Sequence, residues 1–194
     1  DALEEIHKRP VRIQGAGRTD AGVHAINQMA NFNLDVPVPL DKIPVALNRL
    51  IPGDIVCKKA EEVDEDFHSR YDARGKKYRY RILNQRLPDV FIRNYIYHYI
   101  QKLDIEKMKK AGQYIMGRHD FSSFRAKGCG AKNPVKTIYE LRIVEKSPEI
   151  LIEIKGDGFL YNMVRIIAGT LIEVGAGKMK AEAIKDIISA RKRE

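Results

Sequence analysis

Gly17-Arg18-Thr19-Asp20-Ala21-Gly22-Val23-His24-Ala25 is the most informative stretch of this 194-residue chain. Its glycines allow the backbone to turn sharply and to approach a ligand closely. Arg18 supplies a fixed positive charge next to the single carboxylate, Asp20. An isolated Asp-Ala-Gly between strands is more often only a polar turn, because Asp and Gly are typical turn residues. From the residues alone, Asp20 is therefore a candidate reacting group or simply a turn residue.

The composition indicates a globular protein that favours polyanionic partners. Hydrophobic residues make up 44% of the chain, enough for one substantial core or two small ones. Lys and Arg number 35 against 26 Asp and Glu, and the net charge of +9 favours nucleic acid as a partner. Cys57 and Cys129 have no paired spacing, so neither a disulfide framework nor a zinc site is predicted. No signal peptide is visible, and the most apolar stretch, 159–174, contains Arg165 and Glu173, so we expect a cytoplasmic location with no membrane segment.

Residues 1–73 predict short elements on both sides of the Asp20 loop. The expected elements are an opening helix with Leu3 and Ile6 on one face, strands at 11–14 and 30–34, a helix capped by Asp41, and a strand at 55–57. In the second helix, Ile43, Leu47 and Leu50 form the expected apolar face before Pro52-Gly53 stops it.

A basic strand is predicted from Arg74 to Ile82. Its alternation puts Lys76, Tyr78, Tyr80 and Ile82 on one face and Lys77, Arg79 and Arg81 on the other. One interpretation is a solvated edge strand on which lysines prevent aggregation. The other is an RNA surface, since aromatic rings stack on unpaired bases while cations neutralise phosphates.

The remaining residues predict a second set of elements. These are a strand at 95–99, a helix capped by Asp104 with Met108, Ile115 and Met116 buried, a hairpin of 138–144 and 149–154 around Ser147-Pro148, an apolar helix from Phe159, and a last helix at 179–191. Between them, 118–136 is a basic loop that either grips RNA or is an ordinary charged surface loop.

Arg165 is the anomaly of the apolar helix. A guanidinium keeps its proton, and burying it unpaired costs several kcal/mol, so Arg165 should find a carboxylate. Glu173 is one possible structural partner.

The stretch 17–25 resembles the signature of the TruA-type tRNA pseudouridine synthases. Four later blocks resemble the same family in the same order: Phe67-His68-Ser69-Arg70, Lys76-Lys77-Tyr78-Arg79-Tyr80, His119 to Phe124, and Gly158 to Arg165. The resemblance covers nearly the full length. Members of that family open with a strand before the first helix, so the resemblance implies that an N-terminal strand and a final segment are missing here.

The resemblance implies an α+β pseudouridine synthase fold, with two RRM/ferredoxin-like antiparallel units whose sheets join around a central cleft. The order of predicted elements also favours two similar α+β units with helices on one face. We expect these units at 1–73, carrying the Asp20 loop, and at 74–194, carrying the basic strand and Arg165. A homodimer is implied as well.

By the same resemblance, the chain isomerises uridine to pseudouridine on the 3′ side of the tRNA anticodon stem-loop, with no cofactor and no metal. Asp20 is then the catalytic carboxylate and Arg165 its ion-pair partner. Arg18 is then placed to fill the gap left by the extruded uridine or to hold the displaced stack, Tyr78 packs against the base, and Arg79 contacts the substrate. From the basic loop, Arg125, Lys127 and Lys132 are expected to bind RNA.

Two other classes of function stay open. A catalytically silent RNA-binding module would keep the basic strand and its aromatic face. A metal-dependent nuclease would need several clustered carboxylates, whereas the Asp20 loop offers one.

Overall fold

A computed structural model describes residues 2–131 and 133–192, so the predicted RNA contact Lys132 lies outside the described residues. The chain divides between Ala73 and Arg74 into two compact units, each with its own hydrophobic core. In the part that the structure describes, no helix has the length and apolarity that a membrane crossing needs.

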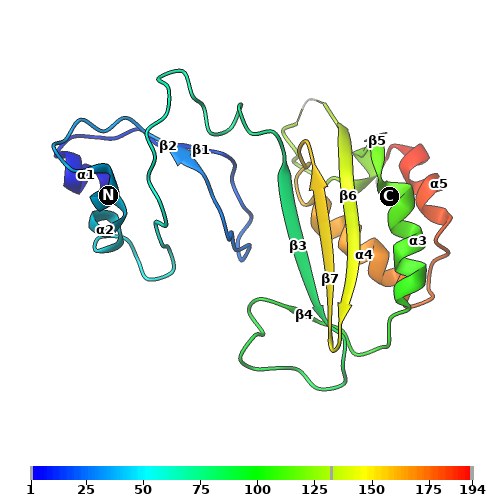
Figure 1. Ribbon diagram of the computed structural model, residues 1–194. Helices are drawn as coiled ribbons and strands as arrows, with labels where there is room; N and C mark the ends of the chain where they lie inside the picture. The colour runs from blue at the N-terminus through cyan, green and yellow to red at the C-terminus, as the bar shows by residue number, and fades with distance from the viewer. Residues whose placement is uncertain (1, 132, 193–194) are drawn as a thin grey trace. The chain divides into compact units, whose positions relative to one another are not determined.

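The N-terminal unit is built from short elements. They are α1 (Ala2–His7), β1 (Gln14–Gly15), β2 (Ala30–Asn31), the 3-10 turn η1 (Leu40–Lys42) and α2 (Ile43–Asn48) (Figure 1). Strands β1 and β2 pair antiparallel, Gln14 opposite Asn31. Leu3, Ile43 and Leu47 form the buried core, as the helical spacing predicted.

Several predictions for this unit were wrong in extent. The strands at 11–14 and 30–34 shrink to two residues each, and 55–57 is not a strand. Ile55 and Val56 are exposed, and the backbone of Cys57 pairs instead with the Asn48 side chain, at 2.7 and 2.8 Å. Leu50 is exposed, and Asp41 lies within η1 without capping α2.

The C-terminal unit contains a five-stranded sheet in the order β4-β3-β7-β6-β5. The strands are β3 (Lys76–Leu83), β4 (Tyr97–His98), β5 (Gly117–Asp120), β6 (Val135–Lys146) and β7 (Glu149–Gly156). The expected hairpin is confirmed by β6 and β7, which pair from Lys146 opposite Glu149. The sheet is mixed rather than wholly antiparallel, because the short β4 runs parallel to β3.

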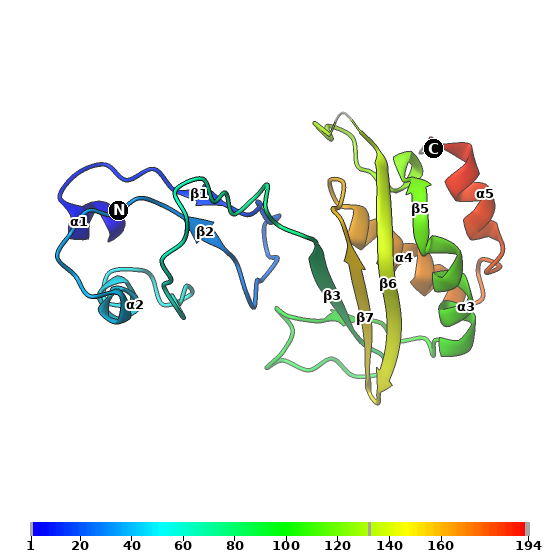
Figure 2. The ribbon, with the colours of Figure 1, turned by 45° about the horizontal axis from the view of Figure 1, so that its top comes forward.

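Helices cover one face of this sheet (Figures 1 and 2). They are α3 (Ile105–Ile115), α4 (Met163–Gly175) and α5 (Ala183–Ala190), and the 3-10 turn η2 (Ser122–Phe124) packs with them. Asp104 caps α3 as predicted, accepting a hydrogen bond from the backbone N–H of Lys107 at 3.0 Å. That bond lowers the pKa of the Asp104 carboxyl. The core beneath the helices includes Met108, Ile152 and Ile167.

The helices also correct two expectations. Met116 follows the end of α3 and is exposed. The apolar helix begins at Met163 rather than Phe159, and Arg165 lies on its exposed face. The described N-terminal residues hold a two-residue strand pair, whereas the C-terminal unit has a five-stranded sheet.

Candidate active site

Asp20 lies in the loop that joins β1 to β2. The base of the loop is closed by two hydrogen bonds, from Ala16 N to the Met29 carbonyl at 2.9 Å and from Gln28 Nε2 to the Gly17 carbonyl at 2.5 Å. Farther out, Val23 N donates to the Asp20 carbonyl at 3.0 Å, and Gly22 has a φ of 76°. That left-handed conformation favours glycine, so a tight turn fixes the backbone that carries the carboxylate.

The motif block Phe67-His68-Ser69-Arg70 holds the base of this loop in place. The side chain of Asn31 accepts from Ser69 N at 3.0 Å and donates to the Phe67 carbonyl at 3.2 Å. Ser69 Oγ donates to the Gln14 carbonyl at 2.6 Å, and Ser69 is only 4% exposed. The residues 67–69 thus tie together both strands that flank the Asp20 loop.

Sequence reasoning missed Asn31, because in the sequence it is only a polar position in an alternating strand. Arg18 is exposed in the Asp20 loop.

An aromatic group lies on the helix-covered side of the C-terminal sheet. Tyr78 and Tyr80 are opposite Ile154 and Ile152 of β7, whose side chains are in the core, so both tyrosines point to that side. The Tyr78 ring meets Phe159 edge to face, with ring centroids 5.1 Å apart. The Tyr80 ring lies 6.3 Å from that of Tyr97.

Arg165 belongs to the same region of the C-terminal unit, because it interacts electrostatically with Tyr80. Burial raises the pKa of the Tyr80 hydroxyl, Tyr97 raises it further, and the positive charge of Arg165 opposes them. Glu173, the structural partner that the sequence left open for Arg165, pairs with Lys178 at 3.2 Å.

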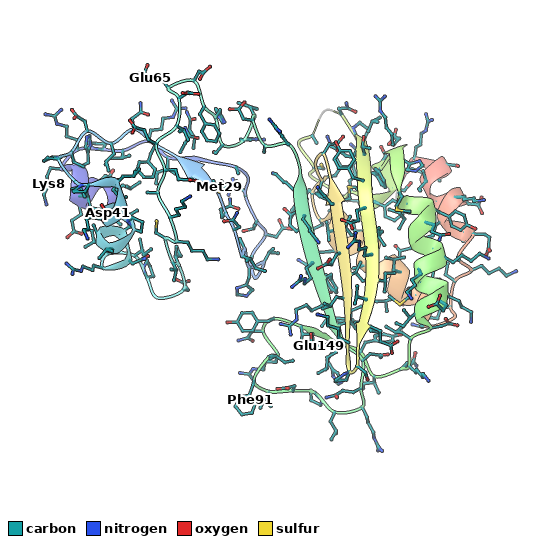
Figure 3. All side chains as sticks on the ribbon, in the orientation of Figure 1. Lys8, Met29, Asp41, Glu65, Phe91 and Glu149 are labelled. Carbon is teal, nitrogen blue, oxygen red and sulfur yellow. The ribbon has the colours of Figure 1, made fainter. Side chains whose placement is uncertain are left out.

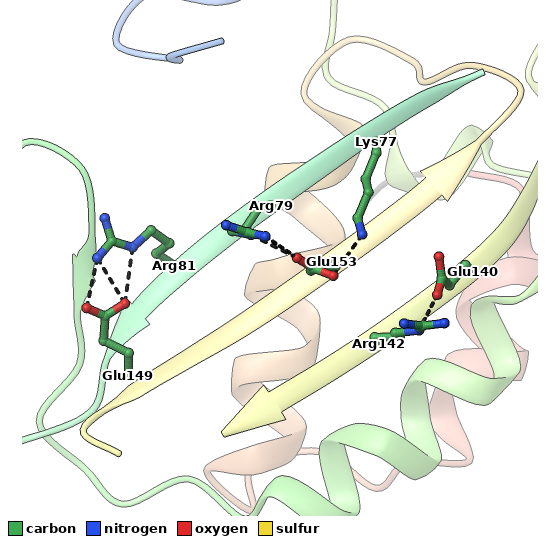
Figure 4. Close-up of polar contacts among 7 residues, drawn as sticks. All are labelled: Lys77, Arg79, Arg81, Glu140, Arg142, Glu149 and Glu153. Atoms are coloured by element: carbon green, nitrogen blue, oxygen red, sulfur yellow. Dashed lines mark hydrogen bonds and ion pairs between the residues drawn. The ribbon is translucent and has the colours of Figure 1, made fainter. Parts of the chain in front are cut away.

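Arg79 is adjacent to Tyr78 in β3 and therefore points to the other face of the sheet, where Figure 4 shows it beside Glu153. Its guanidinium donates twice to Glu153 of β7, at 2.6 and 2.8 Å, and Lys77 reaches the other carboxylate oxygen at 2.9 Å. The hydrogen bonds from these two cations lower the pKa of the nearly buried Glu153 carboxyl, and the bond from Lys77 has the larger effect. Arg79 and Tyr78 thus lie on opposite faces of β3, as the alternation predicted, and the guanidinium of Arg79 is engaged by Glu153.

In the predicted basic loop 118–136, residues 118–120 belong to β5 and 122–124 to η2, and the part that follows η2 is fastened to the segment that precedes α4. Ala126 N donates to the Tyr161 carbonyl at 3.1 Å, and the backbone N–H of Tyr161 binds the Cys129 thiol and lowers its pKa. Arg125 is half-buried and Lys127 is exposed. Two of the motif-bearing regions, 118–136 and 158–165, are thus joined by backbone contacts.

Comparisons with known proteins agree with this set of motifs. The sequence model of the family described as tRNA pseudouridine synthase matches residues 1–72 and 111–194. A tRNA pseudouridine synthase A of Acetivibrio thermocellus is 49% identical over 193 residues, which cover 100% of this chain and 79% of that protein. The chain belongs to the tRNA pseudouridine synthase family. Asp20 lies in the first matched range and Arg165 in the second, whereas Tyr78 lies in the stretch between the two ranges.

Other members of the family are similar over the same extent. The tRNA pseudouridine synthase A of Halalkalibacterium halodurans is 47% identical, over 99% of this chain and 73% of that protein. The one from Bacillus subtilis is 44% identical, over 100% of this chain and 79% of that protein.

Proposed function

We propose that this chain isomerises uridine to pseudouridine in tRNA, on the 3′ side of the anticodon stem-loop, as a homodimer and without a cofactor. Family membership supports the reaction and the tRNA substrate. The single observation that carries the assignment of the catalytic group is the Asp20 turn, fixed by Gly22 and closed at its base by hydrogen bonds.

Asp20 is the carboxylate that the reaction needs. The bond between ribose C1′ and uracil N1 breaks, the base turns, and C1′ bonds to C5. The hydrogen on C5 leaves as a proton and N1 gains one, so no electrons are supplied from outside. One carboxylate suffices, either by attacking the sugar or base or by assisting elimination to a glycal.

Arg165 is the proposed functional partner of Asp20, orienting the carboxylate for these steps. Tyr78 offers an aromatic surface for the extruded base, and Arg18 fills the gap that the uridine leaves in the stack. Arg125, Lys127 and Lys132 supply positive charge for the RNA backbone. Arg79 is not assigned a place beside the base, because Glu153 holds it on the other sheet face.

Tritium release from anticodon stem-loop RNA labelled at uracil C5 tests the proposal, since forming the new bond expels that hydrogen. We expect release by the parent chain, none by Asp20→Asn, and parental release by Asp35→Asn, an exposed carboxylate in the same unit. RNA affinity of Asp20→Asn should stay within about threefold of the parent, as little binding energy is lost when a carboxylate becomes an amide. Full turnover by Asp20→Asn would contradict the assignment.

The alternative of a silent RNA-binding module predicts tight binding of the same RNA with no release by the parent. Arg165→Ala adds a second test. Because Arg165 is exposed on α4, we expect it to lose turnover without losing stability, so a variant that is destabilised yet active would contradict its role.

A further inference from the structure

Tyr161 presents an aromatic side chain to solvent in the segment that precedes α4. It is 48% exposed, and within the described residues no other ring packs against its own. Its backbone is nevertheless held on both sides. The Tyr161 carbonyl accepts from Ala126 N at 3.1 Å, and the Tyr161 N–H donates to Cys129 Sγ. The ring is therefore exposed on an ordered backbone, so a ligand that covers it has little more than one side chain to order.

The stretch 125–136, which contains both of these hydrogen-bond partners, is strongly basic. It has four Lys and Arg and no Asp or Glu, so its net charge is +4. Arg125 and Lys127 flank Ala126, the residue that is bonded to Tyr161. Lys136 lies alongside the same segment, because a Cβ at Gly158 would lie 3.8 Å from Lys136 Cδ. Three cations thus lie near the backbone that carries the exposed ring.

These cations differ from those on the open face of the sheet, which have carboxylate partners. Arg81 of β3, for example, pairs with Glu149 at 2.8 Å, and Figure 3 shows Glu149 at the end of the sheet opposite to the stretch 125–136. In the part of the chain that the structure describes, no carboxylate lies within ion-pair distance of Arg125, Lys127 or Lys136. Their charge is therefore available to an anionic ligand.

An exposed ring beside such cations suits an unpaired nucleotide of RNA. An unpaired base can stack on an aromatic side chain, while Lys and Arg neutralise the phosphates on either side of it. A protein partner fits less well, since the cores of protein interfaces are depleted of charge and of Lys in particular. An inorganic phosphate would use the cations but would leave the ring uncovered.

The ring is also close to the surface proposed for the target uracil. Phe159 meets the Tyr78 ring edge to face and is two residues before Tyr161. Two residues of chain span at most about 7 Å between Cα atoms. A base on the Tyr161 ring would therefore belong to a nucleotide near the target uridine, and a stem-loop offers unpaired nucleotides in its loop.

We propose that the Tyr161 ring stacks on a second unpaired base of the RNA, near the target uridine, while Arg125, Lys127 and Lys136 bind the adjoining phosphates. The inference rests on the tRNA substrate of the proposed function and is independent of the assignment of Asp20.

Fluorescence anisotropy of labelled anticodon stem-loop RNA, titrated with the parent chain and its variants, tests the stacking. Tyr161→Ala should raise the Kd about tenfold, because one base loses its aromatic partner. Tyr161→Phe should stay within about twofold of the parent, since it keeps the ring. The matched control is Tyr139→Ala, an exposed tyrosine that adjoins Glu140 in β6, and it should have the parental Kd.

Two further readouts separate the ring from the cations. Lys136→Ala should reduce the slope of log Kd against log salt by about 0.7, the value for one phosphate contact on a single strand, whereas Tyr161→Ala should leave the slope unchanged. Stem-loop RNAs with one abasic nucleotide each, scanned through the loop, should include one that binds the parent about tenfold more weakly than intact RNA. Tyr161→Ala should bind that abasic RNA and the intact RNA equally, because the ring and the base act as a pair.

The outcomes distinguish this inference from the proposed function. A parent that does not bind the RNA would overturn the tRNA substrate and the inference with it. A parent that binds while Tyr161→Ala keeps the parental Kd, or an equal loss in Tyr139→Ala, would overturn the stacking alone. The backbone bonds of Tyr161 survive its replacement by alanine, and circular dichroism checks the fold; Tyr161→Leu takes its place if Tyr161→Ala does not fold. Tritium release, measured on the same samples, reports separately on Asp20.

Discussion

Replacing Asn31 by alanine should make local opening of the Asp20 loop easier, although Asn31 lies at the base of that loop and not beside Asp20. Ser69 N donates to Asn31 Oδ1 at 3.0 Å, and Ser69 is buried, so the substitution leaves an unpaired buried donor, which costs about 1–3 kcal/mol. The two bonds donated by Asn31 Nδ2, at 3.2 and 3.3 Å, are long and contribute about 0.5–1 kcal/mol each. We therefore expect the local opening free energy at this site to fall by at least about 2 kcal/mol.

Hydrogen exchange measured by mass spectrometry reports that local free energy. Peptides covering 14–31 and 67–69 should exchange about 30-fold faster in Asn31→Ala, since about 1.4 kcal/mol corresponds to a factor of ten. The exchange of β6 and β7 in the C-terminal unit should not change. The matched control is Asn33→Ala, an exposed asparagine two residues farther along. Acceleration of less than about threefold, or an equal effect of Asn33→Ala, would refute the view that Asn31 holds the loop base. Turnover should fall with protection, because the carboxylate loses its fixed backbone.

Three further predictions concern single contacts. Lys77 and Arg79 lower the pKa of Glu153, so the ionised carboxylate should stabilise the fold fully near neutral pH and lose this effect as the pH falls below about 4.3. In urea unfolding, the difference in unfolding free energy between the parent and Glu153→Gln should therefore shrink on acidification, and a difference that does not change with pH would contradict this. Gly156→Ala should lower the unfolding free energy by about 1–3 kcal/mol, because a Cβ there would lie 2.7 Å from the Thr137 carbonyl oxygen, and an unchanged melting temperature would argue against this packing. Gly22→Ala should cost about 1–2 kcal/mol of backbone strain and reduce tritium release, whereas Gly15→Ala should do neither, because Gly15 has open space for a Cβ and its φ is not left-handed. Equal tritium release by the two variants would show that the Asp20 turn tolerates the change.

Local features of this protein could be predicted from its sequence. The α3 helix and its Asp104 cap were predicted correctly, because a cap depends on a side chain and a backbone N–H three residues apart. The β6–β7 hairpin was predicted correctly for the same reason, since its two alternating runs adjoin one turn. The strand at 55–57 failed because apolar residues form a strand only where a neighbouring strand is available, and here none of the described residues pairs with it.

The sequence by itself determined the family and the loop that holds Asp20, because both depend on an unbroken run of residues and on the turn that Gly22 permits. Only the tertiary structure decided that Asn31 and Ser69 fasten that loop and that Glu153 is the partner of Arg79. Period-two alternation shows which side chains share a face of one strand, but not which strand lies beside it. Partners such as Arg79 and Glu153, 74 residues apart, are chosen by strand register, and register is fixed by burial of the whole core.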